Sequence, residues 1–60
     1  MLLERIERHI KVKRMPPSRF GRDAVGDPRF VFQMREGREP RSATVRRVLD
    51  YLHDNEPEGG

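Results

Sequence analysis

The chain has 60 residues, no cysteine, and 13 lysine and arginine residues against 10 aspartate and glutamate residues, a net charge of +3. This length suffices for one small domain, whose stability rests on a few well-packed helices or on self-association. The absence of cysteine excludes disulfides, thiolate metal sites and thiol catalysis. No apolar run approaches the roughly 20 residues that span a bilayer, and the first residues do not resemble a signal peptide. We therefore expect a soluble, cytoplasmic protein with no membrane contact.

Apolar spacing predicts a first helix over residues 2–13, as a scaffold. Its apolar stripe consists of Leu2, Leu3, Ile6 and Ile10. We expect Glu7 to pair with Lys11 at i, i+4 spacing, and His9 to face solvent. A second, short helix is predicted over residues 17–25, because Pro17 suits the first helical position.

A third helix is predicted over residues 28–36, since Asp27 is a good N-cap and Gly37 is a natural stop. Its inner side carries Phe30, Val31 and Met34. Its outer side carries Arg29, Phe32, Gln33 and Glu36. An exposed phenyl ring between arginine and glutamine suits a DNA groove, where arginine reads guanine, glutamine reads adenine and an apolar group contacts a thymine methyl. The alternative is that Phe32 covers a neighbouring helix or a dimer contact.

A fourth helix is predicted over residues 43–53, capped by Ser42. Its stripe completes the core with Val45, Val48, Leu49 and Leu52. Residues 55–60 are polar and acidic with glycine and proline, and we expect a disordered tail there. The sequence thus predicts an all-α domain over residues 1–54, a compact bundle of four short helices in which the second and third helices form a helix-turn-helix.

Arginine is concentrated in the middle of the chain, where residues 14–47 contain nine arginines and only four acidic residues. Guanidinium groups match the geometry of phosphates and base edges, and a basic surface attracts polyanions. The alternative is an arginine-rich surface that is merely solvated.

Several positions resemble the helix-turn-helix of small lambda-repressor-like (Xre/Cro-type) regulators of bacteria and phages, over about residues 18–52. These positions are Phe20, Gly21, Ala24, Val31, Met34, Gly37 and Arg38. The resemblance implies that the third helix enters the major groove, with Glu36 at the edge of the contact. Base-reading positions are then Pro28, Arg29, Phe32 and Gln33. Phosphate-binding positions are Ser18, Arg19, Arg38 and Arg41. The family turn usually has glycine before an apolar residue, whereas this chain has Val25 before Gly26, so we expect a reshaped turn.

We therefore expect sequence-selective binding of double-stranded DNA and transcription regulation at the nucleoid, with Arg22 also holding phosphate. A homodimer on two half-sites is expected, because one domain of this size offers a small interface. Two alternatives stay open. One is an adaptor, antirepressor or antitoxin-like module that presents Phe32 and Arg29 to a protein partner, and the other is nonspecific nucleoid or RNA association.

Catalysis finds little support in the sequence. Ser18, Ser42 and Thr44 stand at helix starts, where capping explains them. His9 and His53 lie near opposite ends of the chain without metal-ligand spacing. We expect no enzymatic activity, no cofactor and no metal site.

Overall fold

The computed structural model describes residues 2–55, and these residues form four helices and no strand. The helices are α1 (Leu2–Lys13), α2 (Pro17–Val25), α3 (Phe30–Arg35) and α4 (Ser42–Asn55). Over this part of the chain the fold is therefore all-α, as the sequence predicts. The predicted bounds of α1 and α2 are confirmed.

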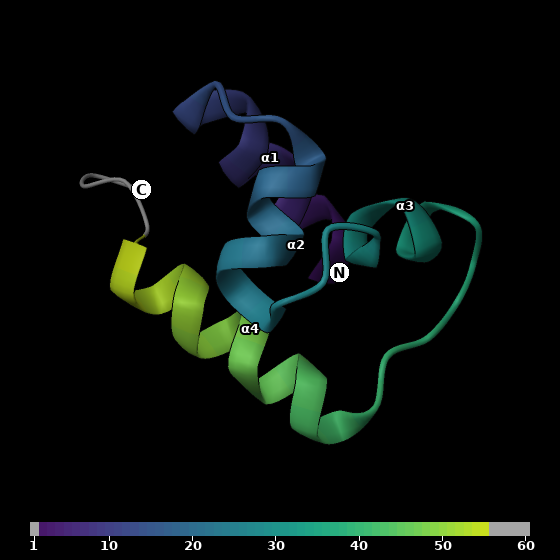
Figure 1. Ribbon diagram of the computed structural model, residues 1–60. Coiled ribbons are helices and arrows are strands. Elements are labelled where there is room, and N and C mark those ends of the chain that lie inside the picture. The colour runs from purple at the N-terminus through teal and green to yellow at the C-terminus, as the bar shows by residue number, and fades with distance from the viewer. Residues whose placement is uncertain (1, 56–60) are drawn as a thin grey trace.

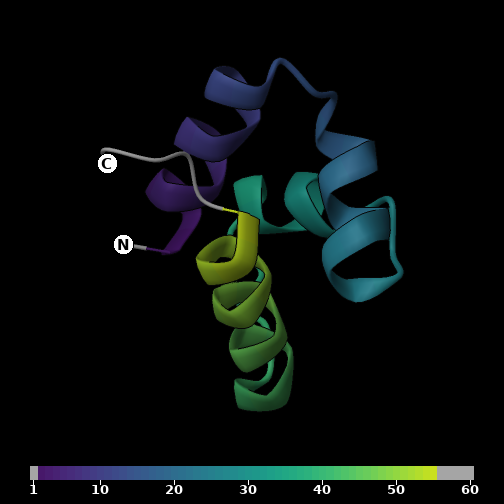
Figure 2. The ribbon, with the colours of Figure 1, turned by 90° about the vertical axis from the view of Figure 1, so that its left-hand side faces the viewer.

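The helices are arranged around α2, which packs against both α3 and α4 (Figure 1). In the view of Figure 2, α3 lies between α1 and α2, and α4 projects away from the other three helices. A long connection, residues 36–41, leads from the end of α3 to the start of α4. Two helices, α1 and α2, thus hold α3, and Phe32 lies on its exposed side.

All four helices contribute to one apolar core. Its buried residues are Ile6, Ile10, Phe20, Ala24, Phe30, Val31, Val48 and Leu52. Phe20 is the largest fully buried side chain, and its ring meets those of His9 and Tyr51 edge to face, with centroids 5.5 and 5.3 Å away. Such pairs add stability beyond the burial of apolar area. This aromatic cluster joins α1, α2 and α4 around one side chain.

Two predictions about burial are wrong. His9 is only 3% exposed, because it lies on α1 beside Ile10 and its ring packs against Phe20 and Tyr51. Leu49 is 39% exposed instead of buried. It follows Val48 directly, so its side chain points about 100° around the helix from the face that α4 turns toward the core.

The third helix is shorter than predicted, with bounds Phe30–Arg35 in place of residues 28–36. The carboxylate of Asp27 accepts the N–H of Arg29 at 2.9 Å, and the carbonyl of Asp27 accepts the N–H of Phe30 at 3.2 Å. Asp27 therefore stabilises a turn that precedes the helix, where the sequence predicts a cap of the helix itself. After Arg35, Gly37 adopts a left-handed conformation with φ +98°, which ends the segment.

The fourth helix is longer than predicted at both ends. The N–H of Val45 donates to the carbonyl of Arg41 at 2.9 Å, so Ser42 is already helical and does not serve as the cap. At the other end, the side-chain amide of Asn55 donates to the carbonyl of Tyr51 at 2.9 Å, within the helix. Asn55, the first residue of the predicted tail, is therefore helical, and the rest of that tail, residues 56–60, lies outside the described residues.

Candidate nucleic-acid interface

The turn between α2 and α3 consists of residues 26–29 and is built on Gly26. This glycine has φ +74°, in the left-handed region that other residues rarely adopt. Its N–H donates to the carbonyl of Arg22 at 3.0 Å, and the N–H of Asp27 donates to the carbonyl of Gly21 at 3.1 Å. These two bonds satisfy two carbonyls near the C-terminal end of α2. The chain therefore leaves α2 in one defined direction.

Gly21 lets α3 approach α2 closely. A Cβ atom at this position would overlap the carbonyl oxygen of Asp27 and lie 3.2 Å from the Cβ of Phe30. Beside this contact, Phe30 and Val31 are buried in the core. The orientation of α3 is thus fixed by its own buried side chains and by the absence of a side chain on α2.

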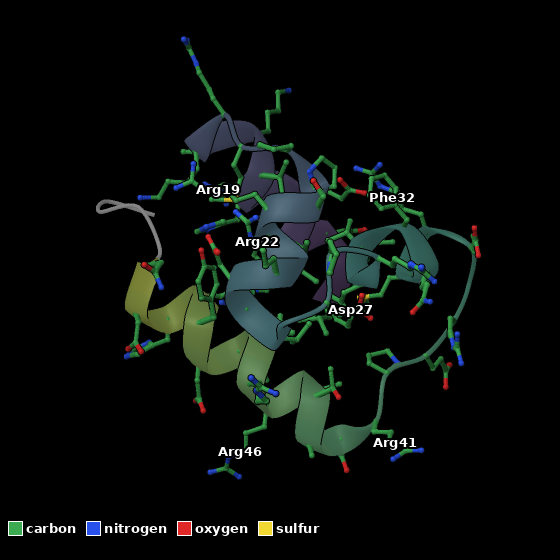
Figure 3. The ribbon with its side chains drawn as sticks, in the orientation of Figure 1. Arg19, Arg22, Asp27, Phe32, Arg41 and Arg46 are labelled. Carbon is green, nitrogen blue, oxygen red and sulfur yellow. The ribbon has the colours of Figure 1, made fainter. Side chains whose placement is uncertain are left out.

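The outer side of α3 carries the residues that the sequence assigns to base reading. Pro28 and Arg29 are exposed in the turn, and Phe32 is 44% exposed on the helix. Figure 3 shows the ring of Phe32 on the far side of α3 from α4. Gln33 differs from these three, because it is half-buried and lines a groove toward α4. Glu36 is exposed just beyond the helix.

A residue that the sequence does not single out, Arg35, anchors this face to α1. Its guanidinium donates two hydrogen bonds, of 2.7 Å each, to the two carboxylate oxygens of Glu7. The same guanidinium carbon lies 5.7 Å from the centre of the Phe32 ring. A bidentate pair of this kind is geometrically specific. The prediction that Glu7 pairs with Lys11 is therefore wrong: its carboxylate binds Arg35, 28 residues away, and local spacing along a helix cannot indicate such a partner.

The Arg35 contact makes the stability of the fold depend on pH through Glu7. Hydrogen bonds from Arg35, aided by its charge and opposed by partial desolvation, hold the pKa of the Glu7 carboxyl below its usual range. The ionised form therefore stabilises the fold at pH values above the unfolded-state pKa of glutamate, about 4.3, and this contribution is lost as the pH falls through the lowered pKa. We expect Glu7→Gln to lower the melting temperature at neutral pH and to have a diminishing effect below pH about 4.

Melting curves recorded between neutral and acidic pH, for the wild type and Glu7→Gln, measure this effect. Glu4→Gln is the matched control, because Glu4 is an exposed glutamate on the same helix. A difference between wild type and Glu7→Gln that stays constant over the whole pH range contradicts the assigned role.

The residues assigned to phosphate binding fall into two groups. Arg19 and Arg22 are exposed on α2, and both guanidiniums lie near the carboxylate of Asp23, at 3.5 and 4.0 Å. In Figure 3 they project to the left of α2, whereas Phe32 lies to its right. Ser18 is half-buried in the first turn of α2. The structure thus separates the α2 arginines from the outer side of α3.

The second group consists of Arg38 and Arg41, which line a groove between α3 and the start of α4. The groove has a volume of about 420 Å³ and also includes Gln33 and Arg47. The sequence does not single out Arg47, because its place beside the 36–41 connection depends on how α4 packs. Arg38, Arg41 and Gln33 are therefore brought together, on the flank of α3 next to its outer side.

The described residues contain no group of three or more His, Cys, Asp or Glu side chains arranged to hold a metal ion. Among the helices of residues 2–55, none has the length and apolar character to cross a membrane.

Comparison with protein-family models, with curated proteins and with solved structures finds no match for this chain.

Proposed function

We propose that the chain binds double-stranded DNA in a sequence-selective manner and regulates transcription, with α2 and α3 acting as a helix-turn-helix. The observation that carries the proposal is the outer side of α3, where Arg29 and Phe32 are exposed while Phe30 and Val31 bury the opposite side. A short recognition helix held by an inner apolar face and bare on its outer face is the arrangement that enters a major groove.

Two further features support this proposal. The turn between α2 and α3 has four residues and contains a glycine, which is typical of helix-turn-helix units. Arg38 and Arg41 lie beside α3, where guanidiniums would meet the phosphates that border a groove occupied by the helix. In this arrangement Arg29 and Gln33 read base edges, and Phe32 contacts a thymine methyl. Arg35, held by Glu7, limits the positions open to the Phe32 ring.

Selection of bound sites from a random pool of double-stranded DNA tests the proposal. We expect an enriched sequence, and for a homodimer two half-sites about one helical turn apart. Binding that falls steeply with salt but enriches no sequence would assign the chain to nonspecific nucleoid or RNA association. Absence of binding at low salt would reject nucleic acid as the partner.

Substitutions separate base reading from phosphate binding once a site is known. We expect Arg29→Ala to lower discrimination between the selected site and random DNA by about 1–3 kcal/mol. Arg41→Ala should weaken binding to all sequences alike and reduce the salt slope by about one. The measurement is a salt titration of affinity for both DNA types.

Arg46→Ala is the matched control for both variants. Arg46 is exposed and does not line the groove that contains Arg41. In Figure 3 it projects from α4 further along the helix, away from Phe32. We expect Arg46→Ala to leave the difference in affinity between the selected site and random DNA unchanged. Equal losses on selected and random DNA for Arg29→Ala would show that Arg29 does not read bases.

A further inference from the structure

The groove between α3 and α4 is lined by four apolar and seven polar or charged residues. The apolar residues, called the floor here, are all buried or half-buried: Val25, Phe30, Met34 and Pro40. The polar and charged residues, called the rim, are Asp27, Gln33, Arg38, Glu39, Arg41, Thr44 and Arg47. Phe30 belongs to the core, and Val25 and Met34 pack against it, but Val25, Met34 and Pro40 are only half-buried. Their exposed apolar surface is a feature that contacts between guanidiniums and DNA phosphates do not use.

The three arginines of the rim are available to a ligand. Among residues 2–55, no hydrogen bond or ion pair engages the guanidinium of Arg38, Arg41 or Arg47. Of the two acids, Asp27 already accepts the backbone N–H of Arg29, whereas the carboxylate of Glu39 has no such contact. The rim thus presents three cationic donors together with acceptors from Glu39 and Gln33.

This mixture of donors and acceptors selects among anionic ligands. A phosphodiester backbone offers acceptors only, so it can bind the arginines but has no N–H donor for the carboxylate of Glu39. A polypeptide offers N–H donors to Glu39 and to the amide oxygen of Gln33, C=O acceptors to the rim, and side-chain carboxylates to the arginines. An apolar side chain of the same segment can lie on Met34 and Pro40, and its removal from water favours binding.

We propose that this groove binds a short acidic peptide segment of a partner protein, with one apolar side chain on the floor and carboxylates on Arg38, Arg41 and Arg47. The argument for peptide binding uses only the residues of the groove and does not depend on the proposed DNA binding. One consequence rests on the proposed function: because Arg38 and Arg41 are then shared with DNA phosphates, a bound acidic segment would displace DNA.

A dye-labelled peptide of sequence Glu-Glu-Leu-Glu-Glu, capped at both ends, serves as the probe, and fluorescence anisotropy measures its binding without DNA. We expect saturable binding, about tenfold weaker binding when serine replaces the leucine, and no binding when lysines replace the glutamates. Arg47→Ala should weaken binding roughly threefold or more, whereas Arg46→Ala, the neighbouring residue outside the groove, should not.

Nuclear magnetic resonance of the wild-type chain locates the site without any substitution. The methyl resonance of Met34, on the groove floor, should shift on peptide addition, whereas those of the exposed Val12 and Leu49 should not.

The proposal is overturned if no saturable binding is found at about 1 mM peptide, if the serine and leucine peptides bind equally, or if the Met34 methyl resonance does not shift. Tighter binding of a single-stranded oligonucleotide to the same groove also overturns it. No DNA duplex is present in these peptide experiments. Their outcome is therefore independent of whether the random-pool selection enriches a DNA sequence.

Discussion

Phe20→Ala is expected to remove a large share of the stability of the fold. Phe20 is completely buried, and its ring contacts those of His9 on α1 and Tyr51 on α4. Truncation of such a side chain costs about 3–5 kcal/mol, through lost burial and the cavity left behind. A 60-residue domain has a total stability of only roughly 3–9 kcal/mol. Chemical denaturation followed by far-ultraviolet circular dichroism measures the loss.

Phe32→Ala is the matched control, because it makes the same chemical change at a side chain that is 44% exposed. We expect its free energy of unfolding to stay within about 1 kcal/mol of the wild type, while sequence discrimination on DNA falls. If Phe32→Ala is as destabilising as Phe20→Ala, the Phe32 ring is part of the packing of the fold, and the outer side of α3 is not a free surface.

Gly21→Ala is expected to destabilise the fold and to reorient α3. The new Cβ would overlap the carbonyl oxygen of Asp27, which is backbone and cannot rotate away as a side chain can. Overpacking of this kind costs about 1–3 kcal/mol, against a helix-propensity gain of up to about 1 kcal/mol for alanine. The turn must move outward, so the hydrogen bond from the Asp27 N–H to the Gly21 carbonyl is weakened.

Two measurements check this expectation. Denaturation should give a lower free energy of unfolding for Gly21→Ala, and the amide resonances of Asp27 and Phe30 should shift together. Arg22→Ala, at the next and exposed position of α2, serves as the control and should stay within about 0.5 kcal/mol of the wild type. An unchanged or increased stability of Gly21→Ala would mean that α2 and α3 do not approach closely at this glycine.

Local sequence signals predicted the helices well where one short-range effect dominates. The 3.6-residue apolar period sets the bounds of α1, and Pro17 sets the start of α2. The same reasoning placed the start of α3 too early, because an Asp-Pro pair suits both a helix cap and a turn, and the carboxylate of Asp27 bonds the N–H of Arg29 in a turn.

The inner and outer sides of α3 were also predictable. Phe30 and Val31 are buried and Phe32 is exposed, as the helical period requires. The helical period cannot indicate which other segment of the chain lies against each side of α3. Gln33 shares the predicted outer side with Phe32, yet it lines the groove toward α4, because the 36–41 connection brings the start of α4 against that flank.

By itself, the sequence determined the helical class, the buried and exposed sides of α3 and the concentration of arginine between residues 14 and 47. Tertiary structure decided the partners: Arg35 with Glu7, His9 with two aromatic rings, and Arg47 with Gln33 in the lining of one groove. The physical reason is the distance along the chain over which each effect acts. Helix periodicity and capping act over about four residues of chain, whereas these contacts join segments far apart in sequence and exist only after the helices have packed.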